Sequence, residues 1–596
     1  MKFDFNTYNK KVRSCFVGKT VGGTLGMRYE GSLEYHEVTY YDPVPDKMIP
    51  NDDLDLQVIN LESVMRSGLP VCRYHLGETW KYHIADHAPD EYAVAVSNYN
   101  AKLNAPLSGI YRNKFYAGMG GAIRSELWAC LAPANPALAA KFAREDACTD
   151  HYSDGVYAEM FLAAVESAAF VESDLLKLIN FGLEYIPDGV KLKNAFIDVI
   201  NWWNDEKDVL SVRKLILDKY IVDNWTDVTI NLCFIILSLL CCEGDFDKAI
   251  CTAASLGYDT DCTAANVGSI FGIINPDGID KKWTDPIGDE LVLSPGIVNM
   301  HEPKTINEFC DGIIVFANEI EKYYKTDVEL SVPENFADIK IAAPWTIDWK
   351  NVYNWCDDSK ESLALVKPLL VNVVYPDTVA ALPATDNNYA LKLTNILSKK
   401  VNVKVSVSLP ESFIAVLSES EVEINVGESV VIPLSVKIEA LRRRAHINLM
   451  TVSLLVNEIP VEFDVGLPVS TPWIVENLDT KEKSVFEADS IFFTVPKGRY
   501  KYTAKFISPC KKEIRMTTTA NGYFTAYLNG EIIKEKKEKY YVPGFHRGRY
   551  WFKTFVENGE NTVEVVFDND EDIEFFLGFA TINGCACMID TMERYI

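Results

Sequence analysis

Two runs of acidic residues lie at the start of segments that have helical periodicity. The first is the Asn-Asp-Asp run at 51–53, directly before an apolar repeat over 54–65, and the second is the Asp-Thr-Asp run at 259–261. Such acids often only cap a helix, because they accept its free N–H groups and favour the positive end of its dipole. Paired carboxylates are also the ligands that a hard cation such as Mg²⁺ prefers. Taken singly, each run fits either role.

The segment after the second run favours the metal role. It contains Ala264, Ala265, Gly268 and Ser269 and almost no charge, so we expect a buried helix. Two acids at the entrance of a buried helix are costly unless they are paired or bind a metal. Two such runs in one domain therefore argue against coincidence.

Three further segments offer residues for catalysis or binding. Glu30 follows a glycine-rich helix, where an acid is more often a surface residue. Glycines in the segment 118–126 let the backbone approach a ligand, although they also fit a tight turn before a helix. The polar loop 149–155 precedes a second Ala-rich helix over 156–171. Its polar residues also fit a simple role as the cap of that helix.

Several other chemistries are excluded by spacing. Gly18-Lys19-Thr20 resembles the end of a phosphate-binding loop, but the glycine that this loop needs five residues earlier is replaced by Arg13. No G-x-S-x-G elbow and no C-x-x-C pair occur. The 14 cysteines and 8 histidines are scattered, which argues for reduced thiols and against a structural zinc site.

Charge and hydropathy restrict the partners. The 58 Lys and Arg residues and the 85 Asp and Glu residues give a net charge of −27, which disfavours nucleic acids and anionic membrane surfaces. No apolar segment reaches the ~18–20 residues of a membrane span, and 230–242 reads as a buried helix. The polar N-terminus lacks a secretory core, so we expect a cytoplasmic protein.

The periodicity changes along the 596 residues, which are enough for several domains. Residues 1–326 have helical spacing, and the glycines at 18, 22 and 26 fall on one helix face that can pack closely against a neighbour. Residues 327–350 read as a linker. Alternation over 401–407 and the short apolar runs after it predict an immunoglobulin-like β-sandwich over 351–476.

The chemistry-bearing segments resemble the ADP-ribosylglycohydrolase family over residues 15–275. The resemblance rests on their order: a G-x-x-x-E segment ending in Glu30, a T-D-D-like segment at 51–53, a G-x-G-x-x-x-R-like segment at 118–124, a His-containing loop after the Ala-rich stretch 137–147, Gly244-Asp245-Phe246, and a G-x-D-T-D-x-T-A segment at 257–264. The most specific part is Gly244-Asp245-Phe246 followed by the run at 259–261.

This resemblance implies an all-α domain with a centre of one or two Mg²⁺ ions, Mn²⁺ being the alternative. We expect the site residues to fall into three groups. The metal ligands are Asn51, Asp52, Asp53, Asp259 and Asp261; the candidates for proton transfer are Glu30 and then Glu126; the substrate-binding residues are Gly120, Gly121, Arg124, His151 and Asp154.

Three positions depart from the family pattern. Asn51 stands where the family has Thr, and Met119 replaces an Asn, which suggests a different substrate. Cys262 stands where the family has Thr or Ser, and a thiol is a poor ligand for Mg²⁺. Thr263 lies one residue further on, which is about 100° around the helix.

The C-terminal residues 477–596 resemble the galactose-binding-like β-sandwiches of glycoside hydrolases, with a strong turn signal at Asn529-Gly530. We therefore expect a metal-dependent hydrolase that cleaves a glycosidic bond at a ribose-like anomeric carbon. The partner is a small sugar or ADP-ribosyl substrate, and the β domains offer surfaces for a homo-oligomer. The alternatives are a glycosidase acting on a plain glycoside or oligosaccharide, and an inactive ligand-binding member.

Overall fold

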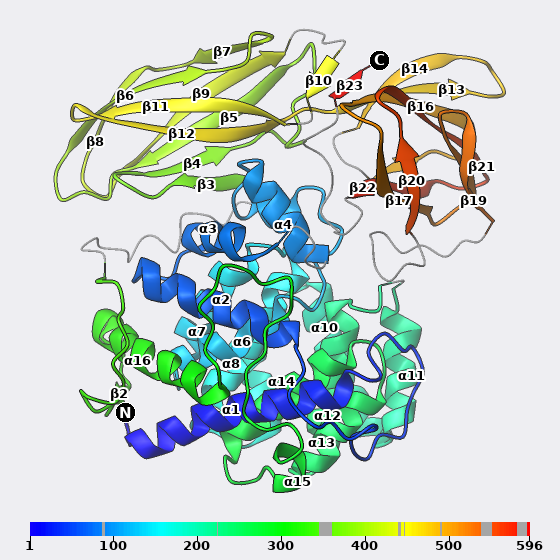
Figure 1. The fold of residues 1–596 in the computed structure, drawn as a ribbon. Helices are drawn as coiled ribbons and strands as arrows, with labels where there is room; N and C mark the ends of the chain where they lie inside the picture. The colour runs from blue at the N-terminus through cyan, green and yellow to red at the C-terminus, as the bar shows by residue number, and fades with distance from the viewer. Residues whose placement is uncertain are drawn as a thin grey trace. The chain divides into compact units, whose positions relative to one another are not determined.

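The chain divides into two compact units in a computed structural model (Figure 1). The first unit consists of Met1–His83 and Tyr116–Thr346, and the second of Ile84–Phe115 and Ile347–Ile596. The structure describes residues 1–85, 90–222, 224–344, 360–438, 443–445, 447–488, 492–537, 551–580 and 593–595.

The first unit is helical, as predicted. Its helices are α1 (Phe5–Gly26), α2 (Asp52–Ser67), α3 (Arg73–His83), η1 (Ala122–Arg124), α6 (Ser125–Leu131), α7 (Pro136–Ala147), α8 (Asp154–Ala168), α9 (Leu175–Gly182), η2 (Leu183–Tyr185), α10 (Lys191–Glu206), α11 (Val209–Tyr220), α12 (Val228–Cys241), α13 (Phe246–Ser255), α14 (Thr260–Ile274), α15 (Lys281–Thr284) and α16 (Ile306–Tyr324). Strand β1 (Lys2–Phe3) pairs in parallel with β2 (Glu329–Leu330), so the start of the predicted linker is part of this unit.

Helices α1 and α14 pack against each other through the glycine face that the sequence predicts. A Cβ atom added at Gly18 would lie 2.1 Å from the carbonyl oxygen of Gly268, and one at Gly22 would lie 2.0 Å from that of Ala264. At Gly26 the corresponding atom is the carbonyl oxygen of Thr260, at 2.1 Å. This contact places the start of α14, with its acids, beside the end of α1.

The glycine contact gives a stability prediction. Gly22→Ala is expected to destabilise the first unit by about 1–3 kcal/mol, since backbone must move to make room for the new methyl group. Gly312→Ala in α16 is the control, because its Cβ would meet only a flexible side-chain carbon of Leu61, at 3.0 Å. Thermal unfolding of both variants checks this, and equal melting temperatures would contradict it.

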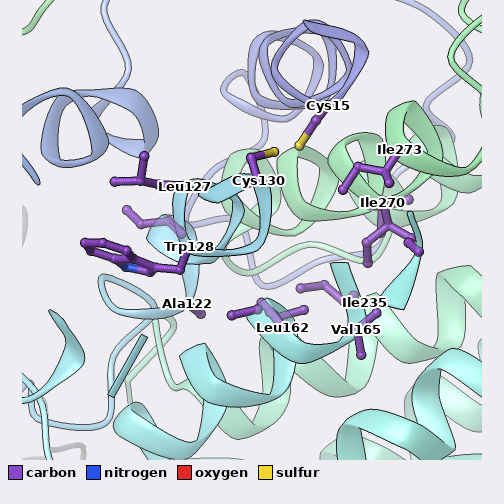
Figure 2. Packing of buried hydrophobic residues seen from close by; sticks show 14 of the residues in the cluster. Cys15, Ala122, Leu127, Trp128, Cys130, Leu162, Val165, Ile235, Ile270 and Ile273 are labelled. Atoms are coloured by element: carbon purple, nitrogen blue, oxygen red, sulfur yellow. The ribbon is translucent and has the colours of Figure 1, made fainter. Parts of the chain in front are cut away.

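A large apolar core lies among these helices. Figure 2 shows Cys15, Leu127, Leu162, Ile235 and Ile270, from α1, α6, α8, α12 and α14, converging on it. Helix α12 is buried along nearly its whole length, which confirms the reading of 230–242 as a buried helix. Within the residues that the structure describes, no helix is both long and apolar enough to cross a membrane. All of the cysteines described are free thiols.

The second unit contains two antiparallel β-sandwiches and two helices, α4 (Asp90–Asn100) and α5 (Leu107–Ile110). The first sandwich joins a sheet of order β3-β4-β5-β9-β7 to one of order β12-β11-β6-β8. Its strands are β3 (Glu361–Leu365), β4 (Leu370–Val374), β5 (Asp386–Thr394), β6 (Val401–Ser408), β7 (Phe413–Leu417), β8 (Glu421–Ile424), β9 (Ser429–Ile438), β11 (Ile447–Val456) and β12 (Ile459–Pro468). The strand that the alternation over 401–407 predicts is therefore present as β6.

The segment 84–115 differs from the prediction, which placed it in the helical domain. Apolar side chains of Leu103, Leu107 and Tyr111 lie in the core of the first sandwich. The amide of Asn104 donates to the carbonyl oxygen of Leu363 at 2.9 Å. Helical spacing shows that these residues have an apolar face, but it does not show which core receives that face.

The second sandwich follows from residue 471. One sheet has the order β10-β23-β16-β21-β18-β19, with β13 pairing β14 and β16, and the other has the order β15-β22-β17-β20. The strands are β10 (Arg443–Ala445), β13 (Thr471–Asn477), β14 (Lys483–Ala488), β15 (Phe492–Val495), β16 (Gly498–Ser508), β17 (Lys512–Ala520), β18 (Phe524–Leu528), β19 (Glu531–Lys536), β20 (Trp551–Val556), β21 (Gly559–Asn569), β22 (Ile573–Ala580) and β23 (Glu593–Tyr595). The Asn529-Gly530 turn joins β18 to β19 with positive φ at both residues, as predicted.

Candidate metal centre

The candidate site lies where α1, α2 and α14 begin or end. After α1 ends, Ser32 forms an antiparallel bridge with Tyr258, and the N–H of Gly31 donates to the carbonyl oxygen of Tyr258 at 2.7 Å. The Thr260 hydroxyl donates to the carbonyl oxygen of Gly26 at 2.8 Å. These bonds hold the turn that carries Glu30 beside the acids at the start of α14.

Helix α2 supplies the second group of acids. The Asn51 side chain caps this helix, because its Oδ1 accepts a hydrogen bond from the N–H of Asp53 at 2.7 Å. Asp52 is partly exposed, whereas Asp53 is only 1% exposed. The capping role considered for this run is therefore real for Asn51, and it fixes the direction in which Asp53 enters the interior.

Asp53, Asp261 and Cys262 bring three possible ligand atoms together. One carboxylate oxygen of each acid and the Cys262 sulfur all lie within 4.8 Å of one another. The Cys262 thiol donates to Asp53 Oδ1 at 3.3 Å. Among the residues that the structure describes, Asp53 Oδ2 and Asp261 Oδ1 are buried without a hydrogen-bond partner. Buried oxygens of this kind point to a missing partner such as a cation.

The electrostatics of this cluster also favour a cation. Burial raises the pKa of Asp53 to about 7, against the opposing effect of Lys19. Burial also raises the pKa values of Asp259 and Asp261 well above the ordinary range, and Glu30 and Asp53 reinforce the increase. These acids disfavour one another's charge, so a bound divalent cation would relieve both the desolvation and the repulsion.

Lys19 connects this cluster to a buried polar network around Glu126. The Lys19 ammonium lies 3.8 Å from Asp53 Oδ2 and donates to Glu126 Oε1 at 2.9 Å. Burial alone would lower the Lys19 pKa, but Glu126 and Asp53 outweigh it and raise that pKa. The ammonium therefore stays charged and ties α1 to α2 and α6.

Glu126 itself is fully buried and accepts from four side chains. Besides Lys19, Gln57 Nε2 donates to Oε2 at 2.9 Å, and Asn266 Nδ2 and Ser269 Oγ each donate to Oε1 at 3.0 Å. Both oxygens of this carboxylate are therefore engaged by side chains of the protein. The geometry therefore gives Glu126 a positioning role and disfavours the predicted role in proton transfer.

Arg124 is the centre of a second buried network. Its guanidinium donates to both oxygens of Asp150, at 3.0 and 2.8 Å, and its Nε donates to Asp146 Oδ2 at 3.0 Å. Burial acts to raise the pKa of Asp150, but Arg124 and His151 outweigh it and lower that pKa to about 2. Arg124 is fully buried and engaged by the protein, so the structure does not present it to a substrate as predicted.

The glycine loop and His151 belong to the same network. The carbonyl oxygen of Gly120 accepts from Arg124 at 2.7 Å, and the N–H of Gly121 donates to His151 Nε2 at 3.3 Å. This bond puts the imidazole proton on Nδ1, which faces Asp150 Oδ1 at 2.6 Å. Asp154 is the first residue of α8, and burial raises its pKa while Lys191 opposes the increase.

Sequence reasoning missed the inner partners of these networks. They are Lys19, Gln57, Asp146, Glu159, Asn266 and Ser269. Lys19 itself could have been noticed, because a charged residue in a helical stretch rich in glycine and apolar residues needs a buried partner. The acids of α7 and α8 gave no such signal, because charged residues at helical spacing usually face solvent.

Comparison with known families decides the classification. A family model described as ADP-ribosylglycohydrolase matches residues 5–316, which is more than half of the chain. The chain belongs to the ADP-ribosylglycohydrolase family. Membership supports a glycohydrolase, and the match includes all of the candidate site residues. A comparison with curated proteins finds no match to the chain.

Three of the solved structures that match the chain do so at low identity. One described as an ADP-ribosylglycohydrolase-related protein complex is 20% identical, with a TM-score of 0.36, and the match covers 48% of this chain and 94% of that one. An α-L-rhamnosidase from Dictyoglumus thermophilum is 15% identical, with a TM-score of 0.14, and the match covers 36% of this chain and 27% of that one. A GH31 α-xylosidase from Xanthomonas citri is 10% identical, with a TM-score of 0.13, and the match covers 38% of this chain and 27% of that one. These values carry no information about the substrate.

The residues present fit the divalent cation that the ADP-ribosylglycohydrolase resemblance implies. Asp53 and Asp261 each keep a buried oxygen without a hydrogen bond, and Asp259 adds a third buried carboxylate beside them. Glu30 and Asp52 are partly exposed and act electrostatically on Asp261, so they border the same cluster. Carboxylates of this density suit a hard or borderline cation.

The raised pKa values predict how pH and metal change stability. An acid whose pKa rises on folding binds protons better in the folded state, so the metal-free protein should lose stability as pH rises from 3.8, the ordinary value, to about 7. A cation binds the deprotonated acids, so Mn²⁺ should raise the melting temperature more at about pH 7.5 than at about pH 5.5. Calorimetry with and without EDTA checks this, and a metal effect independent of pH would contradict it.

Proposed function

We propose that the protein is a divalent-cation-dependent hydrolase that cleaves a glycosidic bond at a ribose-like anomeric carbon. The observation that carries the proposal is the buried carboxylate cluster, with its unsatisfied oxygens, at the junction of α1, α2 and α14 in a glycohydrolase-family domain. Carboxylate oxygens of this cluster are ligands that Mg²⁺ and Mn²⁺ accept, so these are the first ions to supply. We take an ADP-ribosyl adduct as the first substrate class to test.

In this proposal the buried acids hold the cation and the sugar. Asp53, Asp259 and Asp261 supply carboxylate oxygens, and Asp52 completes the set from the exposed side. A bound divalent cation would polarise a water molecule and orient the ribose hydroxyls. Glu30 is partly exposed and acts electrostatically on Asp259, so we assign to its carboxylate the proton of the attacking water.

The two buried networks keep this geometry fixed. The Lys19 ammonium and Glu126 hold α1, α2 and α6 together directly behind Asp53. Arg124 clamps the glycine loop to Asp150 through the carbonyl oxygen of Gly120. The carboxylates of the cluster also oppose the positive charge that develops at the anomeric carbon when the glycosidic bond breaks.

A substrate panel tests the proposal. Protein supplied with Mn²⁺ or Mg²⁺ is incubated with ADP-ribosylated arginine, with an ADP-ribosylserine peptide and with simple nitrophenyl glycosides. Release of ADP-ribose that stops with EDTA is the expected result. Cleavage of only the simple glycosides would assign the plain glycosidase alternative. Cleavage of none, by protein shown to contain metal, would favour a ligand-binding protein and contradict the proposal.

A further inference from the structure

We infer that Cys262 is a sulfur ligand of this centre, so that the site prefers a borderline cation such as Zn²⁺ or Co²⁺ over Mg²⁺. The inference rests on the proposed metal centre and specifies the class of ion that the centre takes. It concerns a residue of this chain that departs from the family pattern at this position.

The position of Cys262 carries the argument. The residue follows Asp261 in the first turn of α14 and is 7% exposed. Its sulfur lies 3.3 Å from Asp53 Oδ1 and within 4.8 Å of a carboxylate oxygen of Asp261. An ion bound between the two carboxylates would therefore lie within reach of the sulfur after small side-chain rotations.

The two neighbouring hydroxyls already donate hydrogen bonds to backbone carbonyls. The Thr260 hydroxyl donates to the carbonyl oxygen of Gly26 at 2.8 Å, and the Thr263 hydroxyl donates to that of Thr260 at 3.3 Å. Both groups are thus committed to backbone bonds within or next to α14. The Cys262 sulfur is the donor atom that lies grouped with the carboxylate oxygens of Asp53 and Asp261.

The donor set determines the preference. Carboxylate oxygens together with one thiolate sulfur match the mixed ligands of Zn²⁺ and Co²⁺, whereas Mg²⁺ demands oxygen ligands and keeps its waters. On binding, the Cys262 sulfhydryl proton leaves to solvent and the sulfur takes its place on the ion. An oxygen ligand at this position would remove the preference.

A cobalt titration of the full chain tests the assignment. Co²⁺ bound to sulfur gives a charge-transfer band in the near ultraviolet, which oxygen ligands do not give. We expect this band in the wild-type protein and in Cys251→Ser, a control at a half-buried cysteine of α13. Cys262→Ser and Cys262→Thr should lose the band, bind Zn²⁺ about 10–100-fold more weakly, and keep their melting temperature without metal.

The outcomes separate this inference from the proposed function. Co²⁺ binding without the band, or a band that persists in Cys262→Ser, would overturn the sulfur ligand and leave the metal centre in place. Absence of any Co²⁺, Zn²⁺ or Mn²⁺ binding would overturn the metal centre itself. If both Cys262 variants unfold, Asp261→Asn provides the second test, because it should also abolish the band in a folded protein.

Discussion

Asp261→Asn is expected to reduce hydrolysis by at least about 100-fold, because a lost metal ligand costs more than the 10–100-fold typical of its supporting residues. Asn has nearly the same shape but no charge, and one of its two oxygens is lost. In the present structure Asp261 Oδ1 is buried without a hydrogen-bond partner among the described residues. The variant therefore removes an oxygen that the fold does not use.

The same substitution should not harm the metal-free fold. Burial, Asp259 and Asp53 all raise the pKa of Asp261, which shows that its charge opposes folding when no cation is bound. We expect Asp261→Asn to melt at the wild-type temperature or higher in EDTA. Added Mn²⁺ should no longer raise that temperature, whereas for a functional site at 100 times its Kd the gain is about 2.7 kcal/mol.

Asp55→Asn is the matched control for this experiment. Asp55 is a buried acid of the same helix α2, and burial also raises its pKa to about 7. Its Oδ1 accepts from the N–H of Ser294 at 3.0 Å, a bond that Asn can keep. The control should retain both activity and stabilisation by metal. Wild-type activity in Asp261→Asn would contradict the assignment of the centre.

Arg124→Met is expected to destabilise the helical unit by about 3–5 kcal/mol, the cost of leaving buried charges without their partner. The guanidinium satisfies both oxygens of Asp150 and one of Asp146, and all three side chains are fully buried. Without Arg124, both buried acids lose their guanidinium partner. The glycine loop would also lose its clamp at Gly120.

Calorimetry of the first unfolding transition measures this effect, since the chain has several domains. Arg66→Ala is the control, because Arg66 is 63% exposed in its pair with Glu62. An exposed pair of this kind contributes about 0–1 kcal/mol. If Arg124→Met melted like the wild type and only raised KM, Arg124 would contact substrate after all.

Local patterns predicted much of the fold. The spacing of Gly18, Gly22 and Gly26 indicated a close helix contact, and α14 supplies it. Alternation predicted strands such as β6, and Asn529-Gly530 predicted the turn after β18. Each of these features depends on residues that are near one another in sequence, so it can be recognised from the sequence alone. The assignment of 84–115 to the sandwich core depends on distant partners and left no local signal.

The sequence pointed to the acids of the candidate site but not to the buried partners around them. Acids before a buried helix drew attention to Asp53, Asp259 and Asp261, because isolated buried charge is costly. The family resemblance then made them ligands of one centre, and the structure places Asp53 and Asp261 close together. Glu126 and Arg124 lie in buried networks whose partners were not evident from the sequence. Whether a charged residue faces a ligand or a buried partner depends on residues such as Lys19 and Asp150, which lie far from it in sequence.

Calorimetric titration of ADP-ribose, first with Mn²⁺ or Mg²⁺ and then with EDTA, tests the central claim most directly. We predict binding that disappears with EDTA and is absent in Asp261→Asn. Unchanged binding in EDTA would contradict a cation held by these acids. Absence of binding by protein that demonstrably contains metal would contradict an ADP-ribosyl substrate and direct the search to simple glycosides.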